Sequence, residues 1–128
     1  MGVTAADFNG DGRPDLATSN WDYSMSIILQ NSDGSFGRAS LINVDEDPFA
    51  IANGDFNGDR KVDLVTIHGD ANRALLFLGK GDGTFENRRR YKVGREPFAI
   101  ATGDFNKDGR SDFITANGQS VTVWFNLP

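Results

Sequence analysis

The sequence contains three copies of one acidic ten-residue pattern, and this repetition constrains the fold more than any other feature. The copies read DFNGDGRPDL, DFNGDRKVDL and DFNKDGRSDF, and they begin at Asp7, Asp55 and Asp104. Their starting points are 48 and 49 residues apart. Regular repeats of roughly 20 to 50 residues are typical of solenoids and propellers. We therefore expect one structural unit that is used three times.

The similarity between the copies extends well beyond the acidic pattern. DPFAIANG at 47–54 returns as EPFAIATG at 96–103, and SDGSF at 32–36 returns as GDGTF at 81–85. In the middle copy, short apolar runs at 49–56, 63–68, 74–78 and 89–93 are separated by Gly and Asp, which favour turns. Four short strands in a repeat of about 40 to 50 residues are typical of one blade of a β-propeller.

The sequence thus predicts an all-β protein built of about 2.7 four-stranded propeller blades. The expected units are residues 1–46, 47–95 and 96–128, and the third lacks its outer strand, so that eleven strands are expected in all. We expect either a partial propeller or one that oligomerisation completes. A closed ring uses roughly four to eight blades, which two copies of this chain would supply and three would exceed.

The acidic pattern itself is a candidate calcium loop. Asp at positions 1, 5 and 9 and Asn at position 3 offer hard oxygen ligands, and the residue at position 7 would turn its backbone carbonyl inward. An Asp at position 9 that binds through both oxygens would complete six or seven ligands. The candidate ligands, for up to three Ca²⁺ ions, are Asp7, Asn9, Asp11, Arg13, Asp15, Asp55, Asn57, Asp59, Lys61, Asp63, Asp104, Asn106, Asp108, Arg110 and Asp112.

Two other interpretations of these loops are less consistent with the sequence. An EF-hand needs an acid at position 12 and a following helix, but Thr18, Thr66 and Thr115 occupy that position in β-rich runs. Turn chemistry without a metal would explain Asn-Gly and Asp-Gly pairs, but not three crowded carboxylates in every copy, which repel one another unless a cation screens them. Arg60 replaces a glycine in the second loop, which we expect to bind more weakly.

The loop and the segments around it resemble the FG-GAP/VCBS-type repeats of integrin-alpha-like β-propellers. The resemblance is carried by the loops, by PFAIA before them, by DLVT after them and by the GDGTF turn, and it covers nearly the whole chain. It implies calcium between the first and second strands of each blade, and an extracellular or cell-surface protein that works in adhesion or ligand binding. We expect the calcium to have a structural and not a regulatory role. This chain has fewer blades than the family's usual ring.

Composition excludes several other classes of protein. The chain has no cysteine, so disulfides and thiolate metal sites are absent. A formal net charge of −5 argues against nucleic acid as a partner, although three bound Ca²⁺ ions would change it to +1. No apolar run approaches the roughly 18 residues of a membrane span, so we expect no membrane insertion. The first residues lack the pattern of a signal peptide.

We expect a binding protein and not an enzyme. His68 is the only histidine and occupies a position that is Asn in the other copies, so we interpret it as a structural residue. The basic run at 88–92 falls on an outer strand, where charge protects exposed edges. Trp21, Asp22 and Tyr23 form a candidate contact for a sugar or a protein.

The expected partners of this protein are a second copy of the chain, most simply in a homodimer, and a protein or glycan ligand. The alternative functions are a lectin-like propeller or an accessory domain of a polysaccharide-degrading enzyme.

Overall fold

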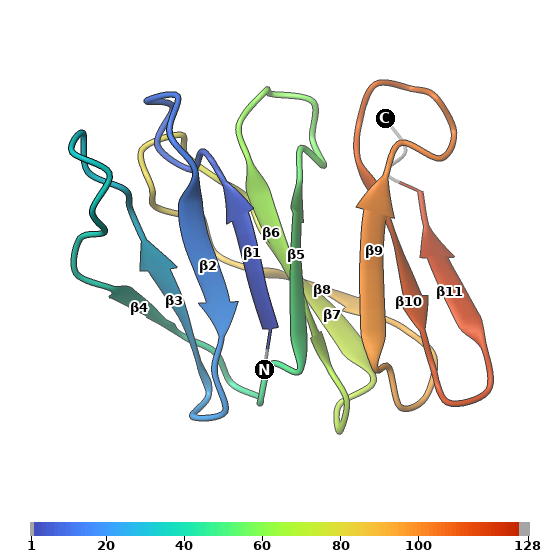
Figure 1. Ribbon diagram of the computed structural model, residues 1–128. Helices are drawn as coiled ribbons and strands as arrows, with labels where there is room; N and C mark the ends of the chain where they lie inside the picture. The colour runs from blue at the N-terminus through green and yellow to red at the C-terminus, as the bar shows by residue number, and fades with distance from the viewer. Residues whose placement is uncertain (1, 126–128) are drawn as a thin grey trace.

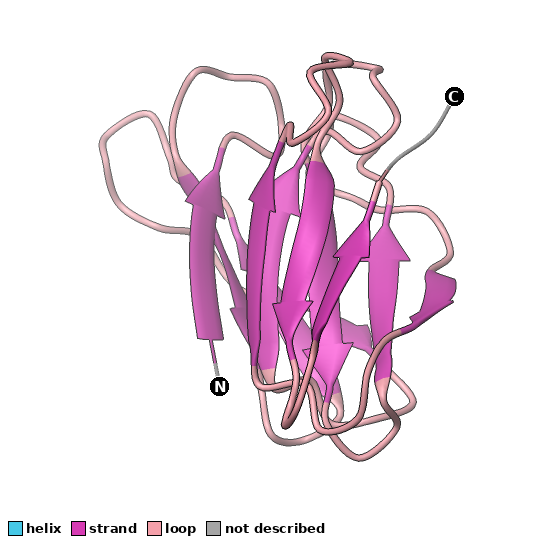
Figure 2. Ribbon diagram, turned by 90° about the vertical axis from the view of Figure 1, so that its right-hand side faces the viewer, coloured by secondary structure: helices cyan, strands magenta, loops and turns pink. Residues whose placement is uncertain are grey.

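The computed structural model describes residues 2–125, and these fold into three antiparallel sheets without a helix (Figures 1 and 2). The prediction of an all-β fold is confirmed, and among these residues the strands number eleven, as expected. No helix of this part is long and apolar enough to cross a membrane. The first sheet contains β1 (Gly2–Ala6), β2 (Asp15–Ser19), β3 (Ser24–Ile28) and β4 (Ser40–Asn43); the second β5 (Ala50–Gly54), β6 (Asp63–His68), β7 (Arg73–Phe77) and β8 (Arg89–Lys92); the third β9 (Ala99–Gly103), β10 (Asp112–Ala116) and β11 (Val121–Trp124).

Each sheet is a simple up-and-down meander whose strands pair in sequence order. The first strand of each sheet contacts the first strand of the next, so that β5 lies between β1 and β9 (Figure 1). The sheets fan out from this line of first strands, which is the arrangement of consecutive blades in a propeller. Within the described residues the third sheet has only three strands, and any structure of residues 126–128 lies outside that range.

The core lies between the sheets and not within any one of them. One cluster joins the first and second sheets and includes Phe8, Met25, Ile27, Leu64 and Leu75. The other joins the second and third sheets and includes Phe56, Val65, Ile67, Leu76 and Phe113. Because side chains alternate along a strand, the second sheet supplies residues to both clusters, and all six residues of β6 are buried.

The basic run occupies the outer edge of the second sheet, as expected. Its strand, β8, pairs only with β7. Arg88 and Arg90 both form ion pairs with Asp45, which follows the outer strand of the first sheet. The charges therefore protect an open edge and link neighbouring blades at the periphery.

His68 is a buried structural residue, as its position in the repeat suggested. Thr66 Oγ1 lies 2.8 Å from His68 Nε2. In the other sheets the same threonine position donates to an asparagine, from Thr18 to Asn20 at 2.9 Å and from Thr115 to Asn117 at 3.0 Å. Burial lowers the pKa of His68, so the imidazole is neutral near pH 7.

We expect the Thr66→Val substitution to lower the free energy of unfolding by about 1–3 kcal/mol, because it leaves the buried His68 Nε2 without its partner. The Thr66→Ser substitution keeps the hydroxyl group and should cost less. Urea denaturation of both variants would measure the difference, and equal losses would show that the hydrogen bond adds nothing to stability.

Candidate metal-binding loops

The three acidic loops lie at one end of the fan, where each connects the first strand of a sheet to the second (Figure 1). The second and third loops are also bonded to one another through the backbone. The N–H of Ser111, in the third loop, donates to the carbonyl of Asp55, in the second, at 2.7 Å. The first loop is bonded instead to the connection between β7 and β8 of the second sheet, where the N–H of Gly83 donates to the carbonyl of Phe8 at 3.0 Å. Each of these bonds ties a loop to the next sheet.

The first three acidic and amide side chains of each loop fold inward. In the first loop, Asp7 accepts hydrogen bonds from the backbone N–H groups of Gly10, Asp11 and Gly12 at 2.8, 3.1 and 2.8 Å. Asn9 Oδ1 lies 3.3 Å from the Asp11 N–H, and Asn9 Nδ2 donates to Asp11 Oδ2 at 3.0 Å. The Gly12 N–H is the main cause that lowers the pKa of Asp7, so its carboxylate is charged.

The other two loops repeat this geometry. Asp55 accepts from Gly58, Asp59 and Arg60, and Asp104 accepts from Asp108 and Gly109. The conformation requires a left-handed backbone at positions 4 and 6. Glycine supplies it at four of the six places, and Lys107 and Arg60 supply the others with φ of 61° and 66°. A non-glycine residue costs about 1–2 kcal/mol in this region, so the second loop is strained at Arg60, as the replacement of glycine suggested, and the third loop is strained at Lys107.

The aspartate at position 9 is fully buried and is bonded to the backbone. Asp15 accepts from the N–H groups of Phe8, at 2.9 Å, and Gln30, at 2.8 Å. Asp63 accepts from Phe56 and Gly79, both at 2.8 Å, and Asp112 accepts from Phe105 at 2.9 Å. This carboxylate therefore fastens the loop to the start of the second strand and, in the first two sheets, to the end of the third strand. The expectation that it also binds calcium through both oxygens stays a prediction.

The basic residue at position 7 forms an ion pair with an acid of its own loop in two of the three copies. Arg13 folds back onto Asp11, with Nη2 2.6 Å from Oδ2, and Arg110 lies 3.4 Å from Asp108. The reason is electrostatic, because the guanidinium partly neutralises the crowded carboxylates. Lys61 has no ion pair among residues 2–125.

The residues present fit calcium in their chemistry. Every candidate side chain at positions 1, 3, 5 and 9 offers oxygen, which is the donor that Ca²⁺ prefers. Positions 1, 3 and 5 approach one another within each loop, whereas the buried aspartate at position 9 is engaged by backbone N–H groups. Within the described part of the chain, no three His, Cys, Asp or Glu side chains are grouped as a metal site.

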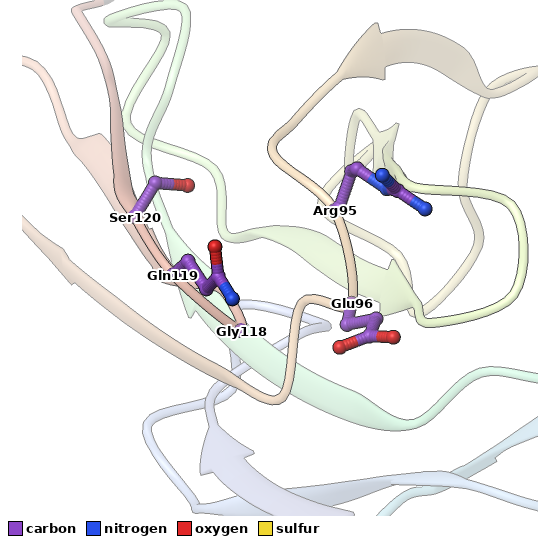
Figure 3. Close-up of a pocket in the computed structure, with 5 residues that line it drawn as sticks. All are labelled: Arg95, Glu96, Gly118, Gln119 and Ser120. Carbon is purple, nitrogen blue, oxygen red and sulfur yellow. The ribbon is translucent and has the colours of Figure 1, made fainter.

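The opposite end of the fan carries open pockets between neighbouring sheets. One, of about 210 Å³, is lined by Trp21, Asp47, Pro48, Phe49, Gly69 and Asp70. Another, of about 310 Å³, is lined by Arg95, Glu96, Gly118, Gln119 and Ser120 (Figure 3). The sequence had singled out Trp21 but not the residues that surround it. The sequence signal that could have located this pocket was the Pro-Phe pair repeated before the first strand of a blade. In the structure Pro48 and Phe49 line the pocket together with Trp21.

Comparison with known proteins agrees with the repeat architecture. A family model described as an FG-GAP-like repeat matches residues 7–66 and again residues 55–115. Each match begins at an aspartate that opens an acidic loop and ends within the second strand of the following blade. No curated protein matches the chain.

The pKa of Asp63 generates a prediction for the metal-free protein. Burial raises this pKa from 3.8 to about 6, and the charges of Asp59 and Asp55 act in the same direction. Between these two values the folded state holds a proton that the unfolded state has lost, so stability falls as pH rises from about 4 to about 6, by on the order of 1–3 kcal/mol. Urea denaturation in EDTA at several pH values would measure this contribution as the difference between the wild type and Asp63→Asn.

The control is Asp47→Asn, which changes an exposed acid at the other end of the fan. This variant should keep the slope of the wild type. If Asp63→Asn also kept it, Asp63 would not be the group that titrates in this window.

Proposed function

We propose that this chain, which belongs to the FG-GAP-like repeat family, is a non-catalytic, calcium-stabilised propeller module that works by binding. The family is generally non-catalytic and is typical of extracellular or cell-surface proteins. The observation that carries the proposal is the presence of three equivalent loops at one end of the fan, each with an Asp-Asn-Asp set of oxygens folded inward.

Calcium in these loops would be structural. The side chains at positions 1, 3, 5 and 9 and the carbonyl at position 7 would hold one ion in each loop. When bound, the ion supplies positive charge that removes the repulsion among the carboxylates and ties the loop to the buried position-9 aspartate. Because the second and third loops are directly bonded, a rigid loop also fixes the position of its neighbour.

The loops differ in how much they need an added cation. In the first loop the ion competes with Arg13 for Asp11, whereas the second loop has no internal ion pair at Lys61. Backbone strain at Arg60 lowers the calcium affinity of the second loop, so we still expect the second site to bind more weakly. In an extracellular protein, calcium modules bind with dissociation constants of about 10⁻⁴–10⁻³ M, and we expect an affinity in that range for these loops.

A ligand would be bound by the connecting loops, and its class is a protein or a glycan in adhesion. Catalysis by His68 is disfavoured, because its imidazole is buried and hydrogen-bonded to Thr66. One specific observation favours carbohydrate, either for a lectin-like module or for an accessory domain of a polysaccharide-degrading enzyme. Trp21 is 73% exposed beside an open pocket that also contains Phe49, Asp47 and Asp70. Aromatic rings that stack on a sugar, with carboxylates that accept from its hydroxyl groups, suit such a ligand.

Calcium should raise the melting temperature of the protein, and EDTA should lower it. The most informative variant is Asp59→Asn, because it removes one ligand charge and keeps an oxygen that can accept from the Lys61 N–H. Isothermal titration should show one site lost or weakened about tenfold or more, which is about 1.4 kcal/mol.

Asp70→Asn serves as the control, since it removes an acid outside the loops and should leave calcium binding unchanged. A melting curve that EDTA does not alter, after verified removal of the metal, would overturn the structural role of calcium.

Glycan binding is tested on an array of immobilised glycans with the wild type and Trp21→Ala. We expect the wild type to retain a set of glycans that the variant loses, because the exposed indole is the stacking surface. Phe125→Ala, which removes an exposed aromatic ring that does not line this pocket, should bind as the wild type does. Binding that Trp21→Ala keeps in full would exclude this pocket as the glycan site.

A further inference from the structure

The two outermost sheet faces of the fan are apolar and uncovered. The leading face is the side of the first sheet that points away from the second, and strand register assigns to it Val3, Ala5, Leu16, Ile28 and Leu41. The trailing face is the side of the third sheet that points away from the second, with Ala99, Ala101, Ile114, Val121 and Val123. Register also places the uncharged Thr18 and Ser26 on the leading face. The one charged side chain that it places on either face is Asp112, on the trailing face, and Asp112 is fully buried.

The interior of the protein shows what covers each kind of face. Between the first two sheets, the side of the second sheet that carries Ile51 and Leu64 packs on the first sheet. Between the last two sheets, the side of the second sheet that carries Val65 and Ala74 packs on the third. In this protein the leading side of one sheet therefore always meets the trailing side of the sheet before it.

Residues at equivalent positions show how far the outer faces depart from that rule. Val3 occupies the place of Ile51 and is 66% exposed, whereas Ile51 is 8% exposed. Val121 occupies the place of Ala74 and is also 66% exposed, whereas Ala74 is fully buried. At these two positions the outer faces thus carry apolar side chains, as the buried faces do, but without cover.

A pair of phenylalanines points to the same missing partner. Phe8, in the first acidic loop, packs edge-on against Phe85 of the next sheet, with ring centroids 5.9 Å apart. The counterpart of Phe8 in the last loop is Phe105, and the counterpart of Phe85 in the first sheet is Phe36. Both are exposed, at 47% and 46%. Phe105 therefore lacks a ring equivalent to Phe85, and Phe36 lacks a ring equivalent to Phe8.

We propose that the trailing face of one copy packs on the leading face of a second copy, head to tail, and places Phe105 of one chain against Phe36 of the other. Every copy carries both complementary faces, so in a closed ring of two copies all four outer faces are covered. The resulting six sheets lie within the roughly four to eight blades of propellers. A face that packed on its own kind would leave Phe36 and Phe105 unpaired, and nothing inside the protein uses that arrangement.

Sedimentation or light scattering at micromolar concentration gives the first test. The expected mass is twice the 14.0 kDa of one chain, and a longer head-to-tail series would support the same contact. A folded protein that remained at the mass of one chain would overturn the proposal.

Two charged variants distinguish head-to-tail packing from other dimers. Val3→Asp damages only the leading face and Val121→Asp only the trailing face, and both sites are exposed in one chain, so each protomer should still fold. Each variant alone should be monomeric. An equimolar mixture should regain a dimer, because the intact trailing face of the first variant meets the intact leading face of the second.

Trp21→Asp, at an exposed site on neither face, should keep the mass of the wild type. A dimer that survived either face variant, or a mixture of the two that stayed monomeric although each variant had lost the dimer, would overturn head-to-tail packing.

The phenylalanine pair allows a direct check, since the chain contains no cysteine. A short bismaleimide should link Phe36→Cys chains to Phe105→Cys chains when the two are mixed. It should not link either variant to itself. Links within one variant, or none in the mixture, would contradict the proposed contact.

Discussion

Contact between the faces of neighbouring sheets is the interaction on which the rest of this structure depends. A meander of four short strands has two faces, and when both are apolar it is stable in water only if other sheets cover them. The second sheet meets this requirement fully, and its central strand β6 is buried along its entire length. The first and third sheets meet it on one side only. The order in which faces meet follows from the repeat, because every sheet has the same handedness and the same inward and outward pattern.

The acidic loops depend on this packing through their buried aspartates. Asp15, Asp63 and Asp112 are inaccessible to solvent and are held by backbone N–H groups, which offset part of the cost of burying a charge. In the second sheet the remaining cost is visible as the raised pKa of Asp63. The loops therefore combine a fixed, buried carboxylate with exposed ones that repel each other. That combination explains how one segment serves both as a turn of the fold and as a candidate ion site.

The two ends of the fan divide the candidate functions. The end with the acidic loops is repetitive, with the same hydrogen bond from the backbone N–H of position 7 to the side chain of position 5 in each blade. The other end varies from blade to blade, because acids and aromatic rings line the pocket between the first two sheets while Arg95 and Gln119 line the next. Variation in connecting loops on a constant scaffold is the usual way in which one fold acquires different ligands.

The sequence by itself determined the repeat, the strands and the chemistry of the loops. The 48- and 49-residue spacing, the alternation of apolar residues and the placement of Gly and Asp are local properties, and they sufficed to predict the eleven strands of residues 2–125, three of them in the third sheet. Only the tertiary structure decided which side chains meet. It showed that Asp15 and Asp63 clamp two backbone segments, that Arg13 folds onto Asp11, and that Phe8 is covered while Phe105 is not. The physical reason is that these relations depend on the packing of one sheet on the next, which identical repeats do not reveal until their order in space is known.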